Sequence, residues 1–532
     1  MNQSFDFVIV GAGSAGCVLA DKLSESGKFT VLVIESGGPD KSALIDMPRG
    51  IGKMQAPGNP HYFWYKAKTS PNSMRNEDWS TGRTLGGSSS VNGMVYTRGH
   101  PEDYNEWERA GCTGWGWNEI GRCMVANESH ELGATEWRGD KGPLKITLHP
   151  KGNVLCEAIL DAAQEAGIPR VDDTNLAFEG GFGYQPRNIH KGRRQSASKV
   201  FLRSAAARPN VEVVTSTDVL RLNFSGRKVT GLQLRDPNGE RTVDVRREVI
   251  LSAGALHSPQ ILQLSGIGPR DLLERLGIAV LVDSPNVGKN LRDHRVLSVS
   301  YKVTTGSLNH EFVGLKLFGN VLRYFLGSTG PMTHAAHEIA GFAKTRPHLS
   351  RPDCQIGGSL FSIEKTDKGI ALGKDHGLTF MGYHTQPKSQ GTIQITSKDL
   401  NAPMQIDANY LTAPEDQEAA VALLRFIRNL AAQPALAKYI VSEIAPGIAV
   451  QNDEQVIRRL LEGGSTSYHF AGTCQMGADA SSVLDPQLRV RGVEGLRVAD
   501  ASIMPTLVSG NTNAPCMAIG RRAAEIILQD QG

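Results

Sequence analysis

Phe5-Asp6-Phe7-Val8-Ile9-Val10-Gly11-Ala12-Gly13-Ser14-Ala15-Gly16 opens the stretch of sequence that decides the fold. An apolar strand runs directly into a glycine turn, and the apolar residues 17–23 continue as a helix. A second apolar strand, Val31-Leu32-Val33-Ile34, ends in Glu35. Strand, glycine turn, helix, strand and acid in this order form a dinucleotide-binding fingerprint. The glycines let the backbone approach a pyrophosphate at a helix N-terminus, and Glu35 can accept hydrogen bonds from a ribose. We therefore predict a bound dinucleotide; a glycine turn in an unrelated α/β fold is the alternative.

Composition is ordinary for a globular protein of several lobes. The 532 residues are 40% hydrophobic and 21% charged, and the net charge of +3 gives no reason to expect nucleic acid as a partner. Seven cysteines are scattered without a CxxC pair or metal-ligand spacing, so we expect no metal site and reduced thiols. Because the first strand begins almost at Met1, we expect no secretory leader. We expect a cytoplasmic protein without a membrane-spanning helix, and leave contact with a membrane surface open.

Signals typical of a nucleotide-binding fold recur far from the N-terminus. Residues 248–254 read as a buried strand that stops at a glycine, and residues 496–500 as another that stops at Asp500. This pattern predicts a discontinuous, Rossmann-like cofactor domain of α/β class with other material inserted. We assign residues 1–155, 196–295 and 464–532 to the cofactor domain, and residues 156–195 and 296–463 to a substrate domain.

The inserted material predicts a mostly antiparallel sheet flanked by helices. Alternating or apolar runs favour strands at residues 296–303, 360–363, 378–386 and 391–396, and helices at 419–430 and 455–461. Leu315, Phe318, Leu322 and Phe325 share one face of a further helix. We favour packing of that face on the sheet; an apolar entrance lip, or a contact with a membrane or another subunit, is the alternative.

Five motifs occur in a characteristic order. They are residues 82–92 (GRTLGGSSSVN), 254–269, 287–294 (VGKNLRDH), 469–477 (HFAGTCQMG) and 510–515 (GNTNAP). Together they closely resemble the glucose–methanol–choline oxidoreductase family, from about Phe5 to the C-terminus. The resemblance implies bound FAD and oxidation of an alcohol, and it implies a loop at Gly86–Asn92 beside the flavin ring. The FAD contacts that we expect are Gly11, Gly13, Ser14, Ala15, Gly16, Glu35, Ser36, Arg83, Gly86, Gly87, Ser88, Asn92, Gly93, Val95, Val219, Ala253, Asp500, Ala501, Asn511, Thr512 and Asn513.

The resemblance also assigns catalytic residues. His469 matches the family's catalytic histidine, and a neutral imidazole suits removal of a hydroxyl proton. The family places His or Asn at a second position facing the same hydroxyl, and we assign it to Asn513, whose amide can donate to a forming alkoxide. Asn511 is the rival for this role, and helix capping is the alternative for both.

Two further residues bear on the cofactor and the substrate. Some relatives attach FAD through a histidine at the position of Val91; because valine has no nucleophile, we predict FAD held without a covalent bond. Relatives that oxidise choline have an acid near the position of Glu338, but many relatives with neutral substrates have one too. An isolated acid more often lies at the surface or is paired, and we favour one of these structural roles over cation binding. Aromatic residues that could line a pocket for an aromatic or apolar alcohol are Phe63, Trp64, Tyr65, Phe361 and Phe380.

The predicted reaction is FAD-dependent oxidation of a primary, aromatic or apolar alcohol to an aldehyde or ketone, with hydride transfer to flavin N5. The electron acceptor is a quinone, another carrier such as a protein, or O₂, and we favour a dehydrogenase. The alternative is a lyase or photodecarboxylase on the same fold, which would use FAD without net alcohol oxidation. Oligomeric state is left open.

Overall fold

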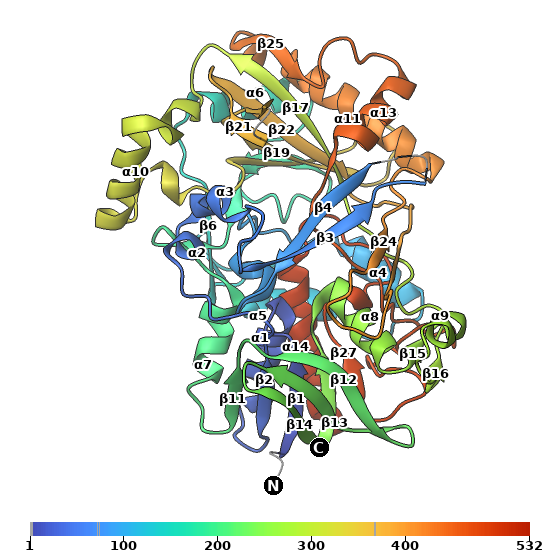
Figure 1. The fold of residues 1–532 in the computed structure, drawn as a ribbon. Coiled ribbons are helices and arrows are strands. Elements are labelled where there is room, and N and C mark those ends of the chain that lie inside the picture. Colours follow the sequence, from blue (N-terminus) through green and yellow to red (C-terminus); the bar gives the residue numbers. More distant parts are fainter. Residues whose placement is uncertain (1–3, 72, 74, 367–368, 532) are drawn as a thin grey trace.

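The computed structural model describes residues 4–71, 73, 75–366 and 369–531, and it contains two large sheets at opposite ends of the molecule (Figure 1). The sheet beside the two termini has the strand order β11-β2-β1-β14-β13-β12, with β27 also paired to β14. Strands β11, β2, β1, β14 and β27 are parallel, whereas β12, β13 and the start of β14 form an antiparallel meander. Their bounds are β1 Ser4–Val10, β2 Val31–Ile34, β11 Val211–Val214, β12 Asp218–Ser225, β13 Lys228–Asp236, β14 Gly239–Leu251 and β27 Leu496–Val498.

Two helices begin side by side at the end of this sheet. Helix α1 (Ser14–Ser24) follows the glycine turn, and α14 (Asn513–Asp530) packs along it. Gly520 permits the close approach, because a Cβ there would lie 2.5 Å from the carbonyl oxygen of Ala15. The Ser14 hydroxyl donates to the Asn513 side-chain oxygen at 2.8 Å, so the first residues of the two helices touch. Both N-termini therefore carry their unpaired amide groups to the same place.

The opposite sheet is antiparallel, as predicted for the substrate domain. Its order is β25-β17-β22-β19-β18-β7, and β26 pairs with the start of β17. The bounds are β7 Gly181–Tyr184, β17 Arg295–Val303, β18 Ile339–Ala343, β19 Cys354–Ser359, β22 Gly377–His384, β25 Ile440–Ala445 and β26 Ser465–Thr466. The strand predicted at 360–363 is wrong, since β19 ends at Ser359 and a separate hairpin strand begins at Ile363. Helices α6 (Val154–Glu165), α11 (Pro414–Ala431) and α13 (Asp453–Gly463) flank this sheet (Figure 1).

A long ribbon connects the two ends of the molecule. Strands β3 (Tyr62–Lys68) and β4 (Asn76–Gly82) form this ribbon, which continues into β24 (Gln405–Asp407) and β23 (Thr392–Gln394) (Figure 1). The remaining helices are α2 Ala43–Asp46, α3 Ile51–Met54, α4 Pro101–Arg109, α5 Trp117–Asn127, α7 Arg203–Ala205, α8 Gly254–Leu264, α9 Arg270–Arg275, α10 Gly314–Gly327 and α12 Pro434–Ala437. The remaining strands are β5 Glu128–His130, β6 Leu144–Leu148, β8 Pro186–Arg187, β9 Ile189–His190, β10 Arg193–Arg194, β15 Ile267–Gly268, β16 Val282–Asp283, β20 Ile363–Thr366 and β21 Gly369–Leu372.

Helix α10 forms where the sequence predicts a helix, but the antiparallel sheet does not cover its apolar face. Leu315, Phe318 and Leu326 are 89%, 68% and 80% exposed. Tyr324 faces inward and packs with Met47 in a small separate apolar cluster. Figure 1 shows α10 projecting from one side of the molecule. The expected packing on the sheet is therefore wrong: periodicity identifies residues that share a face, and it does not identify what covers that face.

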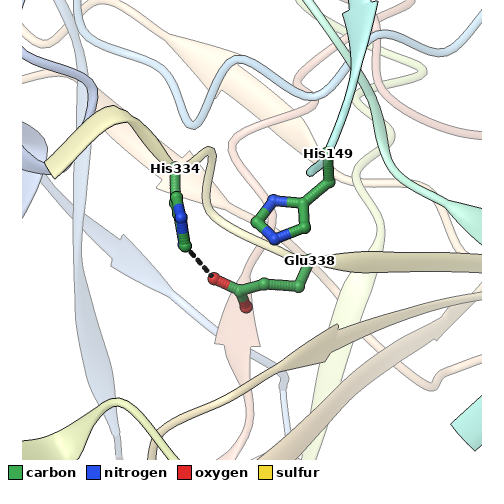
Figure 2. Close-up of side chains that lie close together, drawn as sticks. All are labelled: His149, His334 and Glu338. Atoms are coloured by element: carbon green, nitrogen blue, oxygen red, sulfur yellow. Dashed lines mark hydrogen bonds and ion pairs between the residues drawn. The ribbon is translucent and has the colours of Figure 1, made fainter. Parts of the chain in front are cut away.

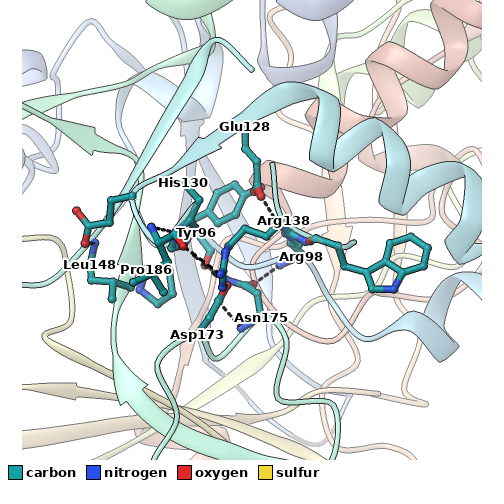
Figure 3. Close-up of polar contacts among 12 residues, drawn as sticks. Tyr96, Arg98, Glu128, His130, Arg138, Leu148, Asp173, Asn175 and Pro186 are labelled. Atoms are coloured by element: carbon teal, nitrogen blue, oxygen red, sulfur yellow. Dashed lines mark hydrogen bonds and ion pairs between the residues drawn. The ribbon is translucent and has the colours of Figure 1, made fainter. Parts of the chain in front are cut away.

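A buried polar network ties the segments between the two sheets together (Figure 3). Arg98 is fully buried and forms an ion pair with Glu128, which also accepts hydrogen bonds from the Tyr96 hydroxyl and from the Gly139 amide. The Arg98 amide donates to the Asn175 side chain at 2.9 Å. Because a buried charge without its partner is costly, this network fixes the backbone on both sides of Thr97.

Candidate active site

The glycine turn is shaped for close backbone approach. Gly11 has φ of 103°, and a Cβ there would lie 2.5 Å from the carbonyl oxygen of Ser252. A Cβ on Gly16 would lie 2.0 Å from the carbonyl oxygen of Gly11. The turn therefore sits tightly between β14 and α1, and it leaves the amides at the start of α1 directed to the space beyond.

A cavity of about 2050 Å³ extends from this turn to His469. Nearly all of the predicted site residues line it: Gly11, Gly13, Ser14, Ala15, Glu35, Ser36, Arg83, Gly87, Ser88, Asn92, Gly93, Val95, Val219, Ala253, His469, Asp500, Ala501, Asn511, Thr512 and Asn513. Gly16 and Gly86 do not line the cavity; they belong to the turns directly behind its lining residues. Gly86 has φ of 86°, and its amide donates to the Ala12 carbonyl at 2.7 Å. A volume about twice that of a large drug-sized pocket leaves room for a dinucleotide and a small substrate together.

Acidic side chains close two sides of the cavity. Glu35 accepts hydrogen bonds from the amides of Ala12 at 3.0 Å and Gly37 at 2.9 Å, and burial raises the pKa of its carboxyl to about 7. A carboxylate has further lone pairs, which remain for ribose hydroxyls. Asp500 accepts from the Gly254 amide at 2.8 Å and from the Ser258 hydroxyl at 2.6 Å. It therefore fixes the start of α8 against the end of β27.

Arg194 supports the predicted flavin loop, a role that its own stretch of sequence does not predict. The loop contains Gly87–Ser90 and ends at Asn92. The buried guanidinium of Arg194 donates to the backbone oxygen of Asn92 at 2.6 Å and to its side-chain oxygen at 2.8 Å, and burial lowers the pKa of Arg194 to about 10. Nothing in the local pattern around Arg194 distinguishes it from its exposed neighbour Arg193, so the sequence alone gave no signal.

His469 belongs to a directed chain of hydrogen bonds that begins at a backbone carbonyl. His294 Nε2 lies 3.0 Å from the carbonyl oxygen of Thr385, and a carbonyl can only accept. Burial lowers the pKa of both histidines, that of His469 to about 3, so both rings are neutral. His294 Nε2 therefore carries hydrogen, and its Nδ1 accepts from His469 Nδ1 at 3.0 Å. The second nitrogen of His469, Nε2, consequently carries a lone pair and can only accept.

Asn511 supplies the amide beside that lone pair. Its Nδ2 lies 3.0 Å from His469 Nε2 and donates to it, whereas its Oδ1 accepts from Gln355 Nε2 at 3.1 Å and from the Thr97 hydroxyl at 3.3 Å. These two donors orient the carboxamide with its N–H groups toward the imidazole. Both Asn511 and His469 line the cavity.

The structure places Asn511, rather than Asn513, in hydrogen-bond contact with His469. Asn513 is the first residue of α14, and its side-chain oxygen accepts from Ser14 at the glycine turn. Asn511 precedes the helix in a loop, so the side chains of the two asparagines leave the backbone in different directions. Neither side chain caps α14, whose N-cap position is Thr512.

A motif residue without an assigned role also contributes here. Asp293 accepts the backbone amide of His469 at 2.8 Å, and the hydroxyls of Thr466 at 2.6 Å and Tyr410 at 2.5 Å. It thereby fixes the segment that carries His469. Asp293 and His294 end the 287–294 motif, which was the available signal for both.

Residues 5–296 match the N-terminal model of the GMC oxidoreductases, and residues 387–520 match the C-terminal model. The chain belongs to the glucose–methanol–choline oxidoreductase family. It is 37% identical over 534 residues to an alcohol dehydrogenase (acceptor) of Pseudomonas putida, covering 99% of this chain and 96% of that protein. It is 38% identical over 532 residues to an oxygen-dependent choline dehydrogenase of Rhizobium etli, with the same coverage. A solved pyridoxine 4-oxidase from Mesorbium loti superposes with a TM-score of 0.88 at 30% identity, covering 98% of both chains.

This GMC oxidoreductase acts on CH–OH groups and uses FAD. Its cavity fits that cofactor on three independent grounds. The crowded glycines admit no Cβ, two helix N-termini meet at Ser14 and Asn513, and Glu35 lies at the end of the second strand. A pyrophosphate is favoured by the first two features and a ribose by the third. Within the parts of the chain that the structure describes, no helix combines the length and the apolar character needed to cross a bilayer.

Glu338 is paired, and its partner Arg49, rather than Glu338 itself, lines the cavity. It is fully buried, forms an ion pair with Arg49, and accepts the Leu360 amide at 3.0 Å. Burial would raise the pKa of its carboxyl, but Arg49 and His334 lower it to about 2. Figure 2 shows His334 and His149 beside this carboxylate, with ligand atoms of all three within 4.8 Å of one another. The donor set does not fit a divalent cation, because the Arg49 guanidinium already neutralises the carboxylate.

Several of the expected aromatic residues line the cavity. Phe63, Trp64, Tyr65 and Phe361 do so, whereas Phe380 lies in the core of the antiparallel sheet. Phe63 and Tyr65 contact His257, with the Arg83 guanidinium over the Phe63 ring, so these two belong to the cofactor side of the cavity. Arg49 also lines the cavity, and its guanidinium lies over the rings of Phe361 at 5.1 Å and Phe312 at 5.5 Å. The positive group is thus shielded by aromatic faces as well as by Glu338.

Proposed function

We propose that this GMC oxidoreductase oxidises an uncharged primary alcohol with an aromatic or apolar substituent to the aldehyde, with His469 as the base and Asn511 as its partner. The observation that carries the proposal is the directed hydrogen-bond chain from Thr385 through His294 to His469. It leaves the lone pair of His469 Nε2 next to the amide of Asn511, on the wall of the cavity.

Bound FAD supplies the hydride acceptor, and the protein has to manage the proton. His469 Nε2 takes the proton from the substrate hydroxyl. The ring becomes positive as it does so, and its Nδ1–H bond to His294 holds it in place. Asn511 Nδ2 donates a hydrogen bond to the oxygen that becomes an alkoxide. His469 is buried and Asn511 is half-buried, and such interactions are stronger at buried positions than in bulk water.

The charges near the substrate end support an uncharged substrate. Glu338 is neutralised by Arg49, so it offers no free negative charge to a quaternary ammonium group. The aromatic residues Trp64 and Phe361 supply apolar surface for an aromatic or aliphatic chain. The proposed substrate therefore differs from choline, for which the relative of Rhizobium etli is named.

We also propose that FAD is held without a covalent bond and that the electrons pass to a quinone or another carrier. Val91 lines the cavity and has no atom that could attack the flavin. The relative of Pseudomonas putida, named for an unspecified acceptor, agrees with a dehydrogenase. Acid precipitation of the holoenzyme tests the first point, because free flavin then stays in the supernatant. Peroxide production during turnover tests the second, and stoichiometric peroxide would contradict it.

The reaction itself is tested by anaerobic mixing of the purified holoenzyme with a panel of alcohols. Neutral aromatic and aliphatic primary alcohols are expected to bleach the oxidised flavin, with choline far slower. The variant His469→Ala should bleach at least about 100-fold more slowly. A lyase or photodecarboxylase would turn over its substrate with no net bleaching, so unbleached flavin across the whole panel would overturn the proposal.

A further inference from the structure

Helix α10 carries an apolar surface that the rest of the protein leaves uncovered. Large side chains that are about half exposed or more on it are Leu315, Phe318, Leu322, Phe325 and Leu326. Val313, directly before the helix, is exposed as well. Soluble proteins expose single apolar side chains commonly, but a cluster of this kind on one element marks an interaction surface.

The same helix borders the entrance to the active-site cavity. Its opposite residues Leu317 and Val321 line the cavity, and Phe325 both lines the cavity and is exposed to solvent. The helix is thus apolar on its outer side and on its inner side. Phe325 therefore joins the exposed apolar surface of the helix to the wall of the cavity.

The charged residues of the helix itself are all basic. Residues 314–327 contain Lys316 and Arg323 and no Asp or Glu. The loop with exposed Lys191 and Arg193 packs at its C-terminal end, where a Cβ on Gly192 would lie 2.3 Å from the Ser328 carbonyl oxygen. Asp or Glu do occur nearby: Glu311 pairs with Lys316, and Asp46 pairs with Lys199. Among the residues that the structure describes, Lys191, Arg193 and Arg323 form no ion pair, and these basic groups complement an anionic surface.

The size of the surface separates a membrane from a second copy of the chain. A helix of 14 residues is about 21 Å long and about 10 Å wide, so the apolar stripe of α10 falls well short of the roughly 800 Å² per partner that a stable dimer buries. A bilayer interface has no such requirement. Amphipathic helices with Leu and Phe on one side and Lys or Arg on the other lie in the headgroup region.

We infer that α10 docks this protein on an anionic lipid bilayer, with Leu315, Phe318, Leu322 and Leu326 immersed at the level of the headgroups. This inference deepens the proposed function, since it lets an apolar alcohol enter the cavity from the lipid phase. The protein would lie on the membrane as a peripheral enzyme, anchored by one short helix and by electrostatic attraction.

Vesicle sedimentation of the holoenzyme tests the inference independently of turnover. The expected result is binding to vesicles of phosphatidylglycerol and phosphatidylcholine, weakened when salt is raised or phosphatidylglycerol is left out. The variant Leu315→Ser with Phe318→Ser should bind on the order of 100-fold more weakly. The matched control is Ile448→Ser, because Ile448 is 78% exposed but lies outside α10, and it should bind like the parent.

Light scattering without lipid measures the oligomeric state, and it tests the alternative that a second copy of the chain covers α10. A monomer for the parent and for both variants is expected. Equal vesicle binding by the α10 variant and the parent would overturn the inference, and so would an α10-dependent dimer that ignores vesicles. Flavin content and melting temperature verify that each variant is folded. Because binding is read without substrate, failure of lipid docking and failure of the proposed reaction are distinguishable.

Discussion

Replacing the two neighbouring asparagines one at a time separates catalysis from cofactor binding. In Asn511→Ala, the amide that donates to His469 Nε2 at 3.0 Å is lost. Removal of one well-placed donor to a developing oxyanion costs about 10²- to 10³-fold in rate. The rate constant of flavin reduction should therefore fall at least about 100-fold, with flavin content unchanged.

Asn513→Ala is the matched control, two residues further on. It removes the acceptor of the Ser14 hydroxyl, a neutral hydrogen bond of 2.8 Å at the glycine turn. Such a bond contributes about 0.5–1.5 kcal/mol, which corresponds to about 2- to 12-fold in affinity. FAD should therefore bind up to about tenfold more weakly, while the saturated variant reduces its flavin at close to the parent rate.

Anaerobic stopped-flow measurements on FAD-saturated protein give the reduction rates, and reconstitution of the flavin-free protein gives the affinities. The variant Asn511→His adds a rescue, because an imidazole N–H can replace the lost amide donor. It should recover most of the rate. Slow reduction in Asn513→Ala together with parent-like reduction in Asn511→Ala would refute the assignment of the pair.

Three further predictions follow from the buried charges and rings. Burial lowers the pKa of His469 to about 3, so the reduction rate should stay constant between pH 8 and about pH 5, and a decline centred near the ordinary histidine value of about 6.5 would contradict this. His294→Leu removes the acceptor of His469 Nδ1–H, which frees the ring to adopt the wrong tautomer, so flavin reduction measured by stopped flow should slow by on the order of 10- to 100-fold. His294→Gln should recover part of that rate, and equal reduction rates in His294→Leu and His294→Gln would argue against the directed chain. Arg49→Met leaves the Glu338 carboxylate without its ion-pair partner, so the melting temperature should fall. The ratio of kcat/KM for choline to kcat/KM for its neutral isostere 3,3-dimethylbutan-1-ol should rise at least about tenfold. An unchanged ratio would show that Glu338 stays out of reach of the substrate.

The part of the site that follows from local sequence is the part built from backbone. The spacing of Gly11, Gly13 and Gly16 after an apolar strand predicts the turn, because only glycine fits where a Cβ would overlap a carbonyl. The same holds for Glu35, which directly ends the second strand. These features need no knowledge of distant residues.

Other features depend on where separate segments meet, and the sequence does not contain that information locally. Whether Asn511 or Asn513 faces His469 is decided by the residue at which α14 begins, and a shift of the helix start by a residue or two would exchange their directions. Arg194 contacts Asn92 across about a hundred residues of sequence. The outward face of α10 was likewise decided by the neighbours that pack beneath it.

The substrate end of the cavity and the exposed apolar surface of α10 both favour apolar, uncharged alcohols. Arg49 removes the free negative charge that a cationic alcohol would need, and two aromatic faces shield the positive charge that it brings. A charged alcohol therefore gains no ionic partner in the cavity and loses its hydration on entering it. An apolar alcohol loses little hydration on entering the cavity, and it concentrates in a bilayer rather than in water.

Lipid docking through α10 would thus raise the local concentration of the apolar alcohols proposed as substrates, while it would not raise that of choline. Selection by charge at Arg49 and access through α10 act on the same property of the substrate, and for that reason loss of the α10 surface should penalise long-chain alcohols more than short ones.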